Sequence, residues 1–302
     1  MLKRRVEVRV PATTANLGPG FDCLGMALEL FNLVRLETGR SGVIITGEGA
    51  DTLPAGPENL VYQAVQRAFQ RAGHPIPPLA LTCRNFIPLA RGLGSSSAAI
   101  VGGLVAANAL MGNPLDIPTL LEMATEIEGH PDNVAPALLG GCQIVVQAEG
   151  RLHTAAVPLA PDLRVVVLIP DQPMPTQQAR AVLPPQVSRP DAVFNLGRVA
   201  LLVNALHSRR WDDLALATQD RLHQPARQAL FPAMPLIFKA ALDAGALGVF
   251  LSGAGSSIVA LTRGREMTIG YEMLDMAHKA GVSATVQITR PWPQGAEVVG
   301  VE

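Results

Sequence analysis

The sequence predicts an α+β protein of two domains, and three observations support that prediction. The chain has 302 residues, enough for about two domains at roughly 100–200 residues each. Hydrophobic residues make up 48% and charged residues 16%, which favours a packed core over disorder. The expected strands and helices follow one another irregularly, without the repeated βαβ units of a parallel sheet.

Residues 1–157 form the predicted first domain, because the chain becomes proline-rich around residues 156–162. Alternating or continuously apolar runs predict strands at 6–10, 28–36, 43–46, 79–83 and 143–147. Apolar residues at helical spacing predict helices at 59–72, 96–111 and 117–128. The third helix also has Asp116 as a plausible N-cap and Pro118 in its first turn.

Residues 158–302 form the predicted second domain. A buried strand at 164–169 is followed by the proline-rich loop 170–175. Helices are expected at 177–182, 192–208, 232–244 and 266–280, and further strands at 249–251, 258–261 and 283–288.

Charge and cysteine content exclude several classes of function. With 24 basic and 25 acidic residues the net charge is −1, so nothing in the charge favours nucleic acid or an anionic membrane as a partner. The three cysteines form no C-x-x-C pair, which argues against a zinc ribbon or a disulfide framework and favours a reducing cytoplasm. The uncharged stretch 92–115 approaches the length of a membrane span, but it opens with glycines and serines and contains Asn108. We expect it to hold a buried helix packed closely against a sheet.

The strongest local signal is a glycine- and serine-rich loop that leads directly into that helix. It consists of Pro88, Leu89, Ala90, Arg91, Gly92, Leu93, Gly94, Ser95, Ser96 and Ser97. Its glycines permit a sharp turn, and the following helix directs free N–H groups into the loop, so the segment suits a phosphate group. It is not a P-loop, because no lysine is near, and Ser97 stands where a dinucleotide fingerprint needs its third glycine. A serine cap on an ordinary helix is the alternative interpretation.

Two further polar segments lie within apolar surroundings. Residues 128–133, Glu-Gly-His-Pro-Asp-Asn, interrupt core-like sequence, and polar groups so placed need partners or do chemistry. Just upstream, Glu122 and Glu126 share one helical face, where a cation would relieve their repulsion; a solvated helix edge is the alternative. Residues 251–257, Leu-Ser-Gly-Ala-Gly-Ser-Ser, form either a tight turn or a second backbone cradle.

Together with residues 10–22, Val-Pro-Ala-Thr-Thr-Ala-Asn-Leu-Gly-Pro-Gly-Phe-Asp, these segments make the chain resemble the small-molecule kinases of the GHMP superfamily, and among them the homoserine kinase family. The motifs run from residue 10 to 257, nearly the full chain. The resemblance implies an N-terminal domain like the second domain of ribosomal protein S5 and a ferredoxin-like C-terminal domain. It also implies a homodimer that binds ATP and L-homoserine between its domains and makes O-phospho-L-homoserine in threonine biosynthesis.

The resemblance also implies roles for individual residues. The loop from Pro88 to Ser97 would hold the ATP phosphates, and Ser96 and Glu122 match the magnesium ligands of the family. The substrate would contact Asn16, Asp22, His130, Asn133, Thr176, Arg180 and Arg227. Arg180 belongs to a T-x-x-x-R motif and would bind the substrate carboxylate, while Arg221 competes with Arg227 for the second arginine. Asn133 and Asn16 would orient the reacting hydroxyl, and Asp132 is the candidate base where one is used.

Two alternatives remain open at this point. Another kinase of the superfamily, such as a mevalonate kinase, would keep the phosphate site but have no use for Asp22. A sensor without catalysis would bind ATP and not turn it over. The chain departs from the family pattern at Ser256, which replaces a proline and predicts a looser turn. The run Ser95–Ser97 also leaves the metal-binding hydroxyl ambiguous by one residue, and Cys23 is expected to serve packing.

Overall fold

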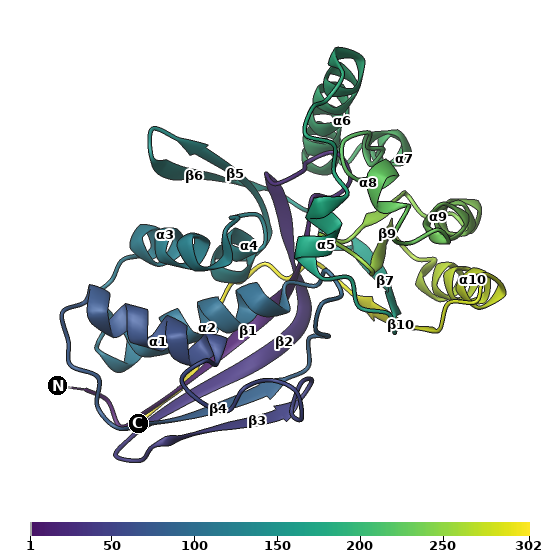
Figure 1. Cartoon of the computed structure of the whole chain (residues 1–302). Helices are drawn as coiled ribbons and strands as arrows, with labels where there is room; N and C mark the ends of the chain where they lie inside the picture. The colour runs from purple at the N-terminus through teal and green to yellow at the C-terminus, as the bar shows by residue number, and fades with distance from the viewer. Residues whose placement is uncertain (1) are drawn as a thin grey trace.

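The computed structural model describes residues 2–302 and shows two α+β domains joined side by side (Figure 1). The predicted fold class is confirmed. Each domain is a sheet covered by helices. The glycine- and serine-rich loop 88–97 and the polar segment 128–133, both of the first domain, lie where the domains meet.

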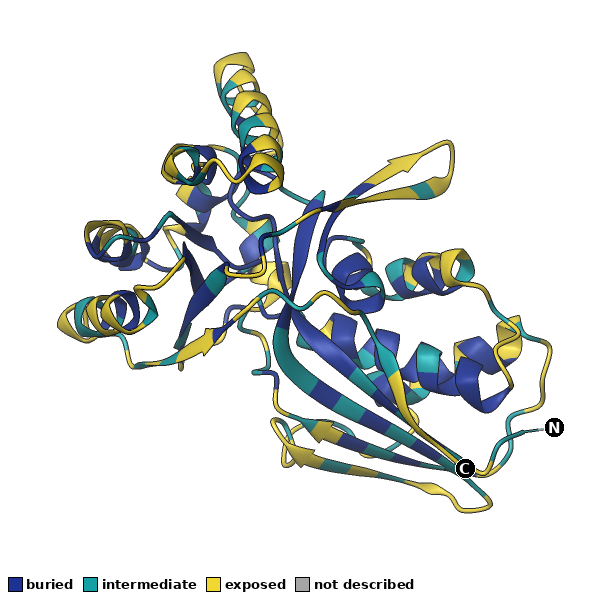
Figure 2. Ribbon diagram, turned by 180° about the vertical axis from the view of Figure 1, so that it is seen from behind, coloured by how far each residue is buried: buried dark blue, intermediate teal, exposed yellow. Residues whose placement is uncertain are grey.

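The first domain contains a seven-stranded sheet. Its strands are β1 (Arg5–Ala15), β2 (Leu24–Thr38), β3 (Gly42–Gly47), β4 (Leu79–Asn85), β5 (Cys142–Ala148), β6 (Arg151–Val157) and β11 (Glu297–Val301). The main order is β11-β1-β2-β4-β3, with β5 paired to β2 and β6 paired to β5. Helices α1 (Leu60–Arg71), α2 (Ser95–Leu110), α3 (Ile117–Glu128) and α4 (Val134–Leu139) cover one face of this sheet (Figure 1). Buried residues gather where helices meet sheet, whereas the far ends of β5 and β6 are exposed (Figure 2).

Helix α2 is buried on nearly all sides, which explains its uniformly apolar sequence. It packs against β1 and β2 on one side and against α1 and α3 on others. A Cβ atom at Gly102 would lie 2.7 Å from Val34 Cγ2, so this helix approaches the sheet more closely than alanine would allow. Within residues 2–302, none of the helices combines the length and the hydropathy that crossing a membrane requires.

The second domain contains a four-stranded antiparallel sheet of order β10-β7-β9-β8, formed by β7 (Arg164–Pro170), β8 (Gly248–Leu251), β9 (Ile258–Thr262) and β10 (Ala284–Thr289). Helices α9 (Met234–Asp243) and α10 (Glu266–Lys279) pack on it. A β-α-β-β-α-β succession with this strand order is the ferredoxin-like arrangement. The remaining helices are α5 (Thr176–Ala181), α6 (Arg189–Ser208), η1 (Trp211–Asp213), α7 (Leu214–Ala217) and α8 (Gln224–Arg227).

The structure differs from the sequence-based expectation mainly in the last strand of each predicted domain and in three short helices. Strand β11 returns to the first sheet and pairs antiparallel with β1, so the predicted second domain, 158–302, gives its last strand to the first. Neither β6 nor β11 was expected: β6 lacks a regular apolar alternation, and β11, although it contains three valines, is only five residues long. The short helices α4, α7 and α8 were not expected either.

The core of the first domain provides a test of the packing. Replacing Phe69, which is fully buried in α1, by alanine is expected to lower the free energy of unfolding by about 3–5 kcal/mol through lost burial and a residual cavity. The same change at Phe86, which is 57% exposed, is expected to cost under about 0.5 kcal/mol. Urea unfolding of the two variants measures this difference, and equal losses would contradict the packing described.

Candidate active site

The glycine- and serine-rich loop is held between β1 and the segment that follows β8. The Thr13 amide donates to the Leu93 carbonyl at 3.1 Å, and Ser252 Oγ donates to the Gly92 carbonyl at 2.6 Å. Gly94 precedes α2 with a φ of +68° and offers no side chain to cap the helix. The first N–H groups of α2 therefore face the cavity without an internal partner, as an anion-binding helix start requires.

Arg91 does not reach the phosphate side of this loop. Its guanidinium donates to the carbonyls of Pro170 at 2.7 Å, Leu89 at 2.7 Å and Asp171. The side chain thus ties the loop to the second domain, although the residue still lines the cavity. The guanidinium of Arg91 thus holds the loop in place through backbone carbonyls.

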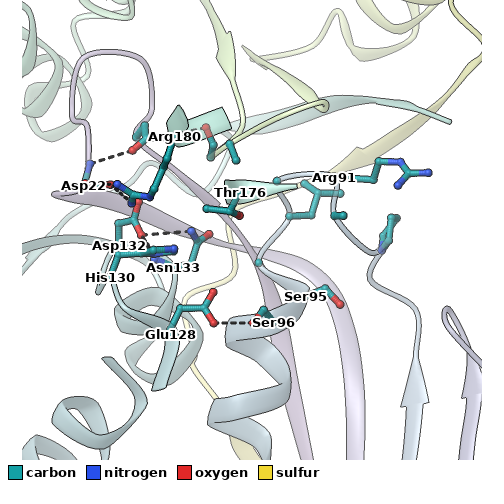
Figure 3. Close-up of a pocket in the computed structure, with 18 of the residues that line it drawn as sticks. Asp22, Arg91, Ser95, Ser96, Glu128, His130, Asp132, Asn133, Thr176 and Arg180 are labelled. Carbon is teal, nitrogen blue, oxygen red and sulfur yellow. Dashed lines mark hydrogen bonds and ion pairs between the residues drawn. The ribbon is translucent and has the colours of Figure 1, made fainter. Parts of the chain in front are cut away.

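Two serines of α2 converge on one carboxylate. Ser96 Oγ donates to Glu128 Oε2 at 2.6 Å, and Ser97 Oγ donates to Glu128 Oε1 at 3.0 Å. Figure 3 shows Glu128 reaching from the end of α3 towards Ser96. Both hydroxyls therefore lie next to the same carboxylate, and the one-residue ambiguity in the serine run stays open.

The expected partner of Ser96, Glu122, is elsewhere. It is exposed and borders a separate hollow with Arg67, Arg71 and Glu126. Six residues correspond to about 600° of helical rotation, so Glu122 and Glu128 point to different faces of α3. The prediction of a Ser96–Glu122 pair was therefore wrong, and Glu128 occupies the place expected of Glu122.

The turn after α3 is organised by Asp132. This buried carboxylate lies 2.8 Å from His130 Nδ1 through Oδ1, and the same oxygen accepts from the Asn133 amide at 2.9 Å. Burial lowers the pKa of His130, but Asp132 and Glu128 outweigh it, so the pKa of His130 is raised. Thr13 Oγ1 donates to Asn133 Oδ1 at 2.8 Å, which fixes the orientation of that amide.

The loop between β1 and β2 carries Asn16 and Asp22. Asn16 Nδ2 donates to the Gly253 carbonyl at 3.0 Å, and Asn16 Oδ1 accepts from the Asp22 amide at 3.0 Å, so both ends of this side chain hold backbone. Asp22 forms a two-pronged ion pair with Arg180 of α5, at 2.8 and 3.0 Å (Figure 3). Thr176 starts α5 and lines the same cavity.

Of the two competing arginines, Arg227 lines the cavity. It is only 2% exposed, and its guanidinium donates to the Gly253 carbonyl at 2.8 Å. Burial lowers the pKa of Arg227 to about 10, a value at which it is still cationic near neutral pH. Arg221 instead lies over the Phe194 ring and pairs with Asp191 at 3.5 Å, outside the cavity lining.

The segment after β8 closes the cavity from the second domain. Gly253 and Ala254 line it, and Ser256, which stands in the place of the family proline, donates from Oγ to the Gln172 carbonyl at 2.6 Å. Ser256 is buried, so this hydrogen bond holds the turn in place of the lost ring. The looser turn expected from the sequence stays a prediction.

Sequence reasoning missed a second hollow beside the loop. It has a volume of about 780 Å³ and is lined by apolar and amide side chains, among them Leu53, Asn59, Leu60, Val61, Asn85 and Leu89. It shares Ala90, Ser95 and Ser96 with the charged cavity of about 590 Å³, so the two hollows adjoin at the loop. Only the loop residues give a local sequence signal, since the other residues lie on β2, α1, β4 and their connections.

The cysteines are not poised for chemistry. Burial, followed by the charges of Asp132 and Asp22, raises the pKa of the Cys23 thiol. Burial raises the pKa of Cys83 and Cys142 to about 12. The thiols therefore stay protonated near neutral pH, in line with a packing role.

The chain is similar to proteins of known class along most of its length. A family model for the GHMP kinases N terminal domain matches residues 59–141, and one for the GHMP kinases C terminal region matches residues 202–268. The homoserine kinase of Moorella thermoacetica is 47% identical over 97% of this chain and 99% of that protein. The homoserine kinase of a Synechococcus species is 46% identical over 97% of this chain and 98% of that protein.

Solved structures give the same result for the fold. The crystal structure of homoserine kinase from Cytophaga hutchinsonii superposes with a TM-score of 0.90 at 34% identity, covering 99% of this chain and 98% of that one. Mevalonate diphosphate decarboxylase from Staphylococcus aureus superposes with a TM-score of 0.72 at 13% identity over 99% of each chain, a likeness of fold alone.

Proposed function

The chain belongs to the homoserine kinase family of the GHMP kinases, and from this membership we propose that its central cavity transfers the γ-phosphoryl group of ATP to the side-chain hydroxyl of L-homoserine. One observation carries the proposal for the substrate. The cavity at the start of α2 is also lined by the carboxylate of Asp22 and by the guanidinium groups of Arg180 and Arg227. An amino acid alcohol needs an anionic and a cationic partner, and these residues provide both.

ATP would occupy the two adjoining hollows. The N–H groups at the start of α2 would bind its phosphates, and the hollow lined by Leu53, Leu60, Val61 and Leu89 would take the base. The carboxamide of Asn85 borders that hollow and would offer a hydrogen-bond partner for a base edge, whereas the carboxamide of Asn59 is engaged in capping α1. A P-loop lysine is not needed, because helix and backbone supply the positive potential.

The donors around Glu128 fit a magnesium ion. Mg²⁺ favours oxygen ligands and keeps several waters, and a carboxylate with two adjacent hydroxyls offers such ligands without closing the site. We propose that Ser96 and Glu128, with Ser97 hydrogen-bonded to the same carboxylate, hold it. When bound, the ion would neutralise charge on the transferred phosphoryl group.

The substrate would enter between Asp22 and Arg180. The ammonium group of the substrate would pair with the carboxylate of Asp22, and the substrate carboxylate would pair with Arg180 and Arg227. These contacts would replace the ion pair between Asp22 and Arg180. Both charges of the cavity are then matched by opposite charges on the substrate. Mevalonate has no ammonium group and would leave Asp22 unsatisfied, which disfavours the mevalonate kinase alternative.

The hydroxyl would be positioned by the turn after α3. Thr13 fixes Asn133, and Asp132 fixes both the Asn133 backbone and His130. Because Asp132 Oδ1 is engaged in these contacts, we propose that Asp132 orders the turn. The family resemblance further supports transfer without a dedicated base. Phosphoryl transfer through a loose transition state depends mainly on positioning and charge stabilisation, which this arrangement supplies. The homodimer implied by the family resemblance and the cytoplasmic location favoured by the cysteine content stay predictions.

Acceptor-dependent ADP release tests the proposal. The protein is given MgATP with L-homoserine, mevalonate, L-serine or no acceptor, and we expect strong turnover with L-homoserine alone. Turnover only with mevalonate would keep the phosphate site and reject the substrate. Binding of ATP without turnover would favour a sensor.

A further inference from the structure

His223 lies between the two charged ends of the proposed substrate site and contacts an element of each. Its side chain is fully buried. Nε2 lies 2.7 Å from the Gly18 carbonyl, on the loop that carries Asp22, and Nδ1 lies 3.0 Å from Nη1 of Arg227. One ring thus joins the first-domain loop to a second-domain arginine.

The partners determine the protonation of this ring. The Gly18 carbonyl can only accept a hydrogen bond, so Nε2 must donate, and a guanidinium can only donate, so Nδ1 must accept. One neutral tautomer satisfies both partners, and a proton on Nδ1 would face the charge of Arg227. Burial lowers the pKa of His223 to about 4, against the opposing attraction of Asp220, so the neutral ring prevails near neutral pH.

The surroundings hold His223 in this position. Asp220 accepts from the amides of Leu222, His223 and Gln224, at 2.9, 2.9 and 2.7 Å, and so fixes the backbone that carries the ring. Asn195 of α6 donates to Asp220 at 2.7 Å and to the Pro19 carbonyl at 3.2 Å. Two neighbouring carbonyls of the Asp22 loop are therefore bound by side chains of the second domain.

Arg227 has only neutral partners in the structure. Its guanidinium donates to the carbonyls of Gly253 and Ala179 and to His223 Nδ1. Across residues 2–302, no carboxylate comes within ion-pair distance of it. A buried cation held this way lacks a counterion, which a ligand carboxylate would supply.

We propose that His223 is a positioning residue that fixes the Asp22 loop and Arg227 relative to each other, and thereby sets the spacing between the ammonium and carboxylate subsites. The proposal rests on the proposed function. It makes recognition of the substrate carboxylate depend on a residue that does not line the cavity. Alcohols with an amino group but no carboxylate are then insensitive to His223.

The test compares L-homoserine with 3-aminopropan-1-ol, which lacks only the carboxylate. In His223→Leu we expect the KM for L-homoserine to rise about 10–100-fold, with kcat and the KM for ATP within about twofold of the wild-type values. Binding of 3-aminopropan-1-ol, measured as an acceptor or as a competitive inhibitor, should change less than about threefold. His223→Gln, which keeps one donor and one acceptor, should recover most of the affinity for L-homoserine.

The controls separate this role from a general loss of structure. His207→Leu makes the same change at an exposed histidine of α6 and should leave all constants unchanged. If His223→Leu does not fold, His223→Asn, whose shorter side chain reaches only one partner, should show an intermediate and carboxylate-selective loss. Equal losses for both alcohols, a parallel rise in the KM for ATP, or no loss at all would overturn the proposal. Failure of the wild-type protein to phosphorylate L-homoserine would instead reject the proposed function.

Discussion

Replacing Glu128 by glutamine is expected to lower kcat with MgATP and L-homoserine by about 10²–10³-fold, the usual cost of removing one group that stabilises developing charge. Ser96 and Ser97 both donate a hydrogen bond to Glu128, and Glu128 lines the cavity at the start of α2. An amide retains the shape of the side chain but removes the negative charge that attracts a divalent cation. Steady-state rates across a magnesium titration measure the loss, and the magnesium concentration for half-maximal rate should rise.

Glu122→Gln is the matched control, because it makes the same change on the same helix. Glu122 is exposed and faces Arg67 and Arg71 in a separate hollow. We expect its rate and its magnesium dependence to equal those of the unchanged protein. A large loss at Glu122 with none at Glu128 would restore the original sequence-based pairing and reject the site described.

Replacing Arg180 by glutamine is expected to raise the KM for L-homoserine by about 10–100-fold, since hydrogen bonds between charged groups contribute about 1.5–3 kcal/mol. Arg180 makes two contacts to Asp22 and reaches the cavity beside Thr176. Without it, the substrate carboxylate loses a planar, two-pronged partner. The KM for ATP should stay within about twofold, because Arg180 lies on the substrate side of the loop.

Arg221→Gln serves as the control for charge. Arg221 is half-exposed and lies over Phe194, outside the cavity lining. Initial rates over a range of L-homoserine concentrations compare the two variants. An equal effect of both on KM would indicate that Arg180 acts only through the net charge of the protein.

Local signals predicted those parts of the fold that are determined locally. Asp116 was expected to cap the helix 117–128, and its carboxylate accepts from the Thr119 amide at 2.9 Å, so that prediction is confirmed. The uncharged segment 96–111 was expected to be a buried helix, and α2 is one. In both cases the periodicity and the flanking residues lie within about twenty positions of each other.

The features that the sequence analysis got wrong or missed depend on contacts between residues that are far apart in the chain. Choosing between Glu122 and Glu128 depends on the face of α3 that meets α2, which is decided by packing between helices. Strand β11 pairs with β1 across almost the whole length of the chain, and nothing in its short, valine-rich sequence indicates this distant partner. His223 gave no local signal, since the Gly18 carbonyl that it contacts lies 205 positions away.

The most direct measurement of the central claim is the fate of the γ-phosphorus in ³¹P NMR spectra recorded with MgATP and L-homoserine. The account predicts a phosphomonoester resonance, split by the two protons of the adjacent methylene group, that grows in step with ADP. A γ-phosphoryl group recovered only as inorganic phosphate, or an ester that forms equally well without L-homoserine, would contradict it.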